Sequence, residues 1–184
     1  MQGHRDSPLT ELGRAQAARQ ADIMAEVFAV FPNLSLFTSP LGRASATAAL
    51  AFAPRVATPD PRLMEVSVGS WEGRLRAEIV AETGRGDADE AAMFDLFLSA
   101  PDGESATALG ARMTEFLATL NGPVALVSHG VVSAFLRGYL QGLPRAEISR
   151  LSHRQGCVWM IWRGVETCLE TPEAARMALA HLRD

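Results

Sequence analysis

Two short apolar segments, each followed by a small-residue turn and a helical segment, constrain the fold of this chain most. Residues 34–38 and 124–128 are apolar runs of strand length, and helical segments follow them at 43–52 and 131–140. Uninterrupted apolar runs of this length are typical of strands buried in a parallel sheet, with helices as the crossovers. The pattern predicts an α/β, three-layer sandwich with a mostly parallel central sheet and helices on both faces.

The remaining segments extend the same α/β pattern. Thr10 is a candidate N-cap for a helix that ends at Pro32, and Pro172 opens a last helix that reaches His181. Residues 157–162 and 165–169 predict a hairpin at the sheet edge. Three further helical segments predict a helical cap over one side of the ligand site: 74–82, 89–98 and 105–120. We expect residues 1–184 to form one domain, because the length is that of a single ordinary globular domain.

Composition excludes several classes of partner. The net charge is −4, which argues against nucleic acid, and all 17 basic residues are Arg, so Arg abundance alone is no sign of phosphate binding. No apolar run approaches the roughly 20 residues of a membrane span, and the polar N-terminus is unlike a signal peptide. We therefore expect a cytoplasmic protein with no membrane partner. The four histidines and two cysteines lack metal-ligand spacing, so no metal or other cofactor is expected.

Arg43 and His129 each lie in the connection between a predicted strand and the helix that follows it. This is the carboxyl edge of the sheet, where open α/β folds bind ligands. The planar fork of Arg43 suits phosphate oxygens, and the carboxyl group of Glu65 suits proton transfer. Each has an ordinary structural alternative: a surface Arg, a structural His, and Glu72 in place of Glu65 as the acid. These residues suit phosphoryl chemistry but include no obvious nucleophile.

Five motifs occur in one order along residues 2–130, and together they are specific. The chain resembles the histidine phosphatase superfamily, the phosphoglycerate mutase-like proteins. The motifs are Gln2-Gly3-x-x-Asp6-Ser7-Pro8-Leu9-Thr10, Ser39-Pro40-x-x-Arg43-Ala44, Met64-Glu65-Val66, Gly103-Glu104-Ser105 and Val127-Ser128-His129-Gly130.

The resemblance implies a role for each matching residue. Arg43 would clamp the phosphate, and His129 would donate hydrogen bonds to phosphate oxygens whose charge grows in the transition state. Glu65 would protonate the leaving alkoxide and then deprotonate the attacking water. Glu104 is expected to anchor a helix start and His153 to be structural. Three residues match positions that border the substrate: Gln2, Gly3 and Gly130.

Family members carry an Arg-His-Gly signature at the end of the first central strand, shortly before the Gln-Gly-x-x-Asp motif. This sequence contains no Arg-His-Gly, and residues 1–9 are too polar and turn-rich for a buried strand. We therefore expect the chain to be N-terminally truncated, without the first central strand and the nucleophilic histidine. His4 is a poor replacement, because its polar segment is expected to be loosely held. Strands left unpaired in this way favour a homodimer.

The resemblance implies a phosphate monoester hydrolase that acts through a phosphohistidine on small phosphorylated metabolites, with the nucleophile absent from this chain, which as given is expected to be inactive. Within the enzyme class, a phosphoglycerate mutase-type phosphomutase is the alternative. The compact stretch 65–103 favours a phosphatase. From a different class, the chain could be a non-catalytic protein that binds a phospholigand or phosphate, or an interaction protein.

Overall fold

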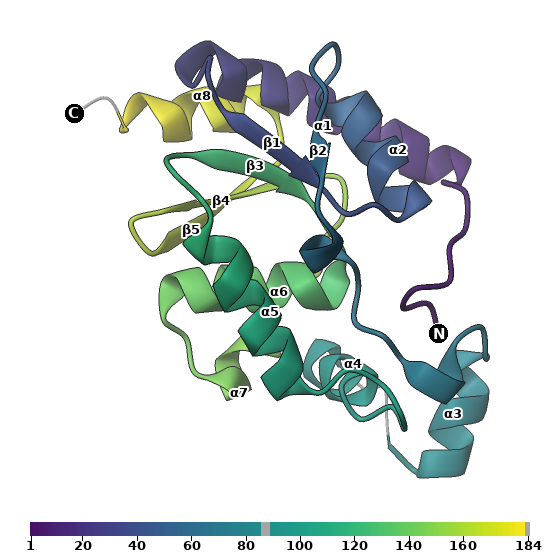
Figure 1. The fold of residues 1–184 in the computed structure, drawn as a ribbon. Helices are drawn as coiled ribbons and strands as arrows, with labels where there is room; N and C mark the ends of the chain where they lie inside the picture. The colour runs from purple at the N-terminus through teal and green to yellow at the C-terminus, as the bar shows by residue number, and fades with distance from the viewer. Residues whose placement is uncertain (86–88, 183–184) are drawn as a thin grey trace.

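A parallel three-stranded sheet forms the centre of the computed structural model, which describes residues 1–85 and 89–182. Its order is β2-β1-β3, with β1 at Ser35–Thr38, β2 at Thr58–Pro59 and β3 at Val124–Val127. The register pairs Thr38 with Val127, so β1 and β3 end at the same level (Figure 1). The prediction of a mostly parallel central sheet is confirmed.

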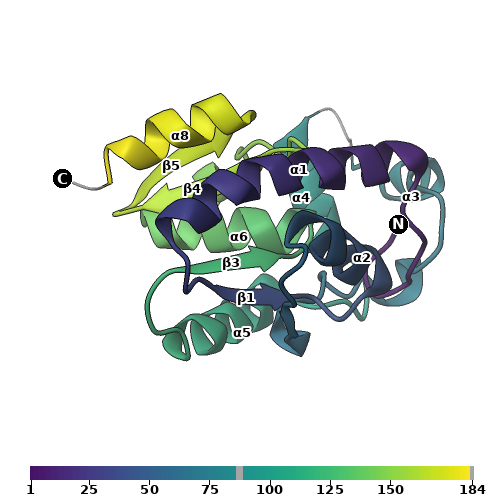
Figure 2. The same cartoon turned by 90° about the horizontal axis from the view of Figure 1, so that it is seen from above.

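Helices cover both faces of this sheet. Alternate strand residues point to opposite faces, and Leu36 accordingly packs with α1 (Glu11–Val30) and α2 (Gly42–Ala51). Phe37 faces the other way and makes an edge-on contact with Phe116 of α5 (Ala106–Ala118), which lies beside α6 (Gly130–Gln141). Figure 2 shows α1 and α5 on opposite sides of β1. The predicted three-layer sandwich is confirmed.

The predicted helical cap forms only in part. The helices α3 (Arg76–Thr83) and α4 (Glu90–Phe97) pack around Trp71 of the short 3-10 helix η2 (Gly69–Trp71), away from the sheet (Figure 1). The third expected cap helix, α5, instead belongs to the central layers. Its Leu109 and Met113 are fully buried in the same cluster as Val132 of α6. The prediction was wrong for α5 because its apolar face is buried against α6 rather than turned toward the site.

The C-terminal hairpin forms a sheet of its own. Strands β4 (Val158–Trp162) and β5 (Val165–Leu169) pair antiparallel, as predicted. Among the described residues, however, β4 pairs only with β5 and β3 only with β1, so the hairpin is not hydrogen-bonded to the central sheet. Val158 nevertheless packs in the same apolar cluster as Ala125 and Val127 of β3. The two sheets therefore share an apolar core but are not joined by strand-to-strand hydrogen bonds.

Three short or terminal elements complete the described chain. The 3-10 helix η1 (Pro61–Leu63) precedes Glu65, and α7 (Arg145–Ile148) follows α6. The last helix, α8 (Pro172–Ala180), packs against α1. Over residues 1–85 and 89–182, no helix is both long and apolar enough to cross a membrane. The expectations of one domain and of an absent first strand stay predictions.

Candidate functional site

The parallel pairing of β1 and β3 brings Ser39 and His129 together. The Ser39 amide donates to the Val127 carbonyl at 2.9 Å, which extends the ladder by one residue beyond β1. Beyond it, Ser39 Oγ lies 2.7 Å from Nε2 of His129, the N-cap residue of α6. The carboxyl edge of the sheet, which the sequence predicts as the ligand site, therefore carries the imidazole of His129.

Arg43 lies in the first turn of α2 at the same edge. Its guanidinium donates to the carbonyls of Gly3 at 2.8 Å and Arg5 at 3.0 Å, and Nη1 lies 3.6 Å from an Asp6 carboxylate oxygen. Asp6 also accepts the amides of Gly42 and Arg43 at the start of α2. Burial tends to raise the pKa of Asp6, but the amides of Arg43, Gly42 and Ser7 outweigh it and hold that pKa below its ordinary value.

Glu65 is buried against the beginning of α6. Its carboxylate accepts the amides of Val66 at 3.0 Å, Val131 at 3.2 Å and Val132 at 3.3 Å. The last two belong to the first turn of a helix, where amides have no partner within the helix. Burial raises the pKa of Glu65 above its ordinary value despite these donors. A raised pKa lets a carboxyl group hold its proton nearer neutral pH, as a general acid must.

The imidazole of His129 is held neutral. Burial, and after it the positive charge of Arg43, lower its pKa to about 3. A neutral imidazole donates from one ring nitrogen and accepts at the other, so His129 can offer one hydrogen bond to an anion. Arg43, in the first turn of α2, and His129, the N-cap of α6, both follow strands that are parallel and in register, so both residues lie at the carboxyl edge of the sheet.

The N-terminal segment lines the site but presents Gly3 rather than Gln2 to it. Gly3 is buried, and a Cβ there would overlap the Val66 carbonyl and the Glu72 carboxylate. Gln2 is exposed, and its side-chain oxygen accepts a hydrogen bond from Ser7 Oγ at 3.3 Å. Of these two predicted substrate-binding residues, the structure therefore places Gly3 beside the Glu65 segment and turns Gln2 toward Ser7.

His4 is held more firmly than its sequence context suggests. Its amide donates to Glu72 at 2.7 Å, and its Nε2 lies 2.9 Å from the Glu65 carbonyl. A carbonyl oxygen only accepts, so Nε2 carries the proton in this contact. The expectation of a loosely held His4 was therefore wrong.

Glu72, which the sequence offers only as an alternative acid to Glu65, holds this whole segment in place. Its carboxylate accepts the amides of Gly3 at 3.2 Å, His4 at 2.7 Å and Arg5 at 3.1 Å. Although burial tends to raise the pKa of Glu72, these amides hold it below the ordinary value. An anchored, low-pKa carboxylate is poorly suited to proton transfer at neutral pH, which favours Glu65 over Glu72 as the acid.

Gly130, the first residue of α6, lies between Glu65 and His153. A Cβ added at Gly130 would stand 3.8 Å from Glu65 Oε2 and 3.5 Å from His153 Nδ1. Gly130 therefore borders the Glu65 carboxyl group, and its predicted contact with substrate stays a prediction. His153, which the sequence suggests is structural, also lies at this border.

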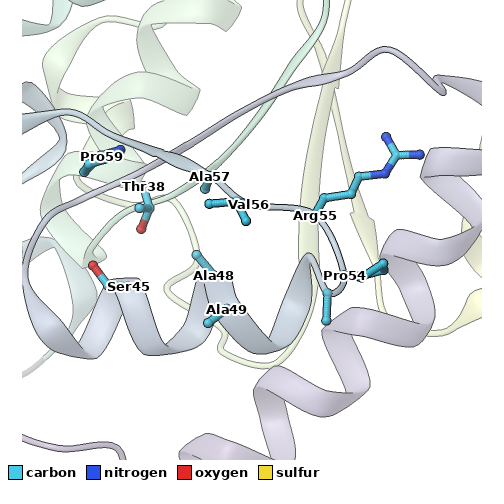
Figure 3. A pocket seen from close by; sticks show the side chains of 10 residues that line it. Thr38, Ser45, Ala48, Ala49, Pro54, Arg55, Val56, Ala57 and Pro59 are labelled. Carbon is cyan, nitrogen blue, oxygen red and sulfur yellow. The ribbon is translucent and has the colours of Figure 1, made fainter.

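Two surface hollows lie near α2, and neither contains the three candidate catalytic residues. The one in Figure 3 lies between α2 and the chain before β2; it is lined mainly by small apolar residues, with the Arg55 side chain directed away toward the Pro32 carbonyl. The other is lined by Asp6, Ser7, Pro8 and Gly42. Their lining lacks Glu65 and His129, so neither defines the candidate site.

Comparison with known proteins agrees with this arrangement. A family model, histidine phosphatase superfamily (branch 1), matches residues 1–167. Glucosyl-3-phosphoglycerate phosphatase of Mycobacterium tuberculosis (strain ATCC 25618 / H37Rv) is 31% identical over 175 residues, covering 86% of this chain and 75% of that protein. A Yersinia pestis (strain Pestoides F) protein named "Probable phosphoglycerate mutase GpmB" is 34% identical over 167 residues, covering 84% and 73%.

Solved structures give the same result. The alpha-ribazole phosphatase of Shigella flexneri superposes with a TM-score of 0.71 at 26% identity, covering 94% of this chain and 88% of that one. A mycobacterial glucosyl-3-phosphoglycerate phosphatase in complex with inorganic phosphate has a TM-score of 0.62 at 32% identity, covering 83% and 78%. With the family model matched over residues 1–167, the chain belongs to the histidine phosphatase superfamily.

Proposed function

We propose that this chain carries the phosphate-binding and acid–base part of a phosphatase site for small phosphate monoesters. The observation that carries the proposal is that Arg43 and His129 both follow the carboxyl ends of paired strands, while the buried Glu65, with its raised pKa, lies on the first turn of α6. Phosphate needs rigid, charged donors, and Arg43 supplies a planar pair of them. The first turn of α6 adds the positive end of a helix dipole.

The proposed reaction has two steps. A histidine nitrogen attacks phosphorus, the bond from phosphorus to the ester oxygen breaks, and the proton of Glu65 passes to the departing alkoxide. In the second step Glu65 takes a proton from water, the water oxygen attacks the phosphohistidine, and the bond from phosphorus to nitrogen breaks. Arg43 and His129 stabilise the charge that develops on the phosphoryl oxygens in both steps.

We propose that the attacking histidine is absent from the 184-residue sequence and is supplied on a strand between β3 and β4. Within residues 1–85 and 89–182, β3 and β4 each have one edge without a strand partner, and they share an apolar cluster through Val127 and Val158, which supports this position. Such a strand would run beside β3 and could end near His129. His4 is the rival nucleophile within the sequence, since its Nε2–H contact leaves Nδ1 with a lone pair.

The names of the relatives support phosphorylated metabolites as the substrate class. They include a glucosyl-3-phosphoglycerate phosphatase and an alpha-ribazole phosphatase. Another relative is named as a probable phosphoglycerate mutase, so a phosphomutase activity remains the alternative within the enzyme class. The cytoplasm is the proposed location. The same unpaired strand edges also suit a homodimer.

An extended variant tests this proposal. The chain is extended at its N-terminus by a short apolar strand that ends in Arg-His-Gly, and a matched extension carries Arg-Ala-Gly. Hydrolysis of p-nitrophenyl phosphate and ³¹P detection of a phosphohistidine are measured for both and for the unextended chain. We expect turnover and phosphohistidine with the His extension alone.

Three outcomes would contradict the proposal. A folded His-extended variant that binds phosphate without hydrolysing the ester would favour the non-catalytic phospholigand-binding alternative. Phosphohistidine on the unextended chain that disappears in His4→Asn would place the nucleophile at His4. Transfer of the phosphoryl group to a sugar-acid phosphate rather than to water would favour the phosphomutase.

A further inference from the structure

Glu65 lies on a segment that has little regular structure of its own. The short helix η1 ends at Leu63, and residues 64–68 belong to neither a helix nor a strand. The backbone there is held instead by groups from elsewhere in the fold. Ser128 Oγ donates to the Leu63 carbonyl at 3.0 Å, and the Glu104 amide donates to the Ser67 carbonyl at 2.8 Å.

Arg112 of α5 makes the closest connection to this segment. Its Nη1 donates to the Arg62 carbonyl at 2.5 Å and to the Met64 carbonyl at 2.8 Å, on the N-terminal side of Glu65. Its other two nitrogens form a bidentate pair with Glu104, at 2.8 Å from Nε and 2.5 Å from Nη2. Both side chains are mostly buried, with exposed fractions of 18% for Arg112 and 16% for Glu104.

The expected role of Glu104 as an anchor for its own helix does not account for these contacts. Ser105 is the N-cap of α5, and its hydroxyl accepts the Ala108 amide at 3.1 Å. The Glu104 carboxylate turns to Arg112 instead. A bidentate partner fixes the plane of a guanidinium, so the remaining Nη1 points in one direction. That direction is the backbone on the N-terminal side of Glu65.

We propose that the Glu104–Arg112 pair positions Glu65, by holding the backbone of residues 62–67 so that the Glu65 carboxylate stays on the first turn of α6. Arg112 is a positioning residue, since it acts through backbone carbonyls rather than on the phosphate. The inference rests on the role proposed for Glu65. The experiment that tests it measures only where the Glu65 carboxylate lies, not catalysis.

The amides of Val131 and Val132 report this placement directly. They lie in the first turn of α6, where the Glu65 carboxylate is their acceptor. Their hydrogen exchange can be followed by NMR on the 184-residue chain. In Arg112→Met we expect both amides to exchange about tenfold faster or more, as for the loss of one hydrogen bond to a charged group. Arg176→Met, which removes an exposed Arg of α8, is the matched control and should leave them unchanged.

A charge swap separates positioning from simple support of α5. In Glu104→Arg/Arg112→Glu the ion pair can form again, but a carboxylate at position 112 cannot donate to carbonyls. In the swapped variant we expect the α5 amides of Met113 and Phe116 to be protected from hydrogen exchange as in the wild type. The amides of Val131 and Val132 should still exchange fast, as in Arg112→Met. Recovery of all four amides in the swap, or unchanged Val131 and Val132 in Arg112→Met, would overturn the proposal.

If Arg112→Met does not fold, Glu104→Gln provides the same reading, because it weakens the hold on the guanidinium and keeps the side-chain shape. Faster exchange at Val131 and Val132 with unchanged Met113 supports positioning, and no selective change overturns it. These readings need no turnover, so failure of the proposed function, seen as a lack of hydrolysis, stays distinguishable from failure of this inference.

Discussion

Ser39 and His129 are 90 positions apart in the sequence, and the Ser39 hydroxyl lies 2.7 Å from Nε2 of His129. Ser39 is fully buried, and its Oγ also accepts the Leu41 amide at 3.3 Å. The contact exists because β1 and β3 are parallel and in register, so that residues just past their ends meet. The fold thereby fixes the imidazole ring at the edge where the phosphate is proposed to bind.

The lowered pKa of His129 predicts a pH-dependent contribution to stability. An unfolded histidine titrates near its ordinary value of 6.5, whereas in the fold the pKa is about 3, so between these values the unfolded chain binds more protons. The contribution is present above pH 6.5 and is lost as the pH falls toward 3. The difference in unfolding free energy between the wild type and His129→Asn, from urea titrations, should therefore increase from pH 4 to pH 7. A flat difference, or a His129 ring signal that titrates near 6.5, would refute this.

Removing the Glu72 carboxylate should destabilise the N-terminal segment. Glu72→Ala leaves the amides of Gly3, His4 and Arg5 without their acceptor, and we expect a loss of about 2 to 3 kcal/mol of unfolding free energy. Glu72→Gln retains one acceptor oxygen and should lose less. The exposed Glu78 of α3 offers the control, and chemical denaturation is the measurement. A loss in Glu72→Ala no larger than that in Glu78→Ala would show that Glu72 does not hold this segment.

A buried ion pair joins α6 to the hairpin. Arg137 donates to Glu166 at 2.8 Å and 2.7 Å and to the Ser152 carbonyl at 2.7 Å, and its side chain is 5% exposed. Arg137→Met leaves Glu166 without its cation, so we expect a loss of about 3 to 5 kcal/mol. Arg176→Met removes surface ion pairs with Glu173 and Glu26 and should cost less than about 1 kcal/mol. Equal losses in the two variants, measured by thermal and urea unfolding, would show that the Arg137 pair adds nothing beyond a surface contact.

Replacing Glu65 with Gln should separate chemistry from binding. The amide keeps one oxygen acceptor for α6 but cannot deliver or take the proton. In the His-extended variant we expect kcat to fall by about 10²- to 10⁴-fold, with phosphate affinity nearly unchanged. Glu72→Gln serves as the control on a neighbouring carboxylate. A Glu65→Gln variant that retains its kcat would assign the proton transfer elsewhere.

Local patterns in the sequence predict most of the elements, because their signals lie within the elements themselves. Thr10 caps α1 through its hydroxyl as expected, and the segments around Arg43 and His129 form α2 and α6. The two residues of β2 carry no periodicity, and Pro59 is an unfavourable strand residue, so that strand is invisible in the sequence. The assignment of α5 to the cap was wrong because an apolar helix face does not say which layer will bury it.

The site is harder to predict from the sequence than the fold, because its contacts join distant segments through backbone atoms. The motifs identify Arg43, Glu65 and His129. The side-chain pattern does not predict that Glu72 accepts backbone amides or that Arg112 donates to backbone carbonyls. The neutral state of His129 likewise depends on burial and on Arg43, which only the three-dimensional arrangement determines.

The most direct test of the account is calorimetric titration of inorganic phosphate into the 184-residue chain and two matched variants. Arg43→Met removes the proposed clamp, and Arg14→Met removes an exposed Arg of α1. We predict saturable binding to the wild type and to Arg14→Met, with affinity about 10- to 100-fold lower in Arg43→Met, as for the loss of hydrogen bonds from a charged donor. Equal phosphate affinity in Arg43→Met and the wild type would contradict the proposed phosphate site.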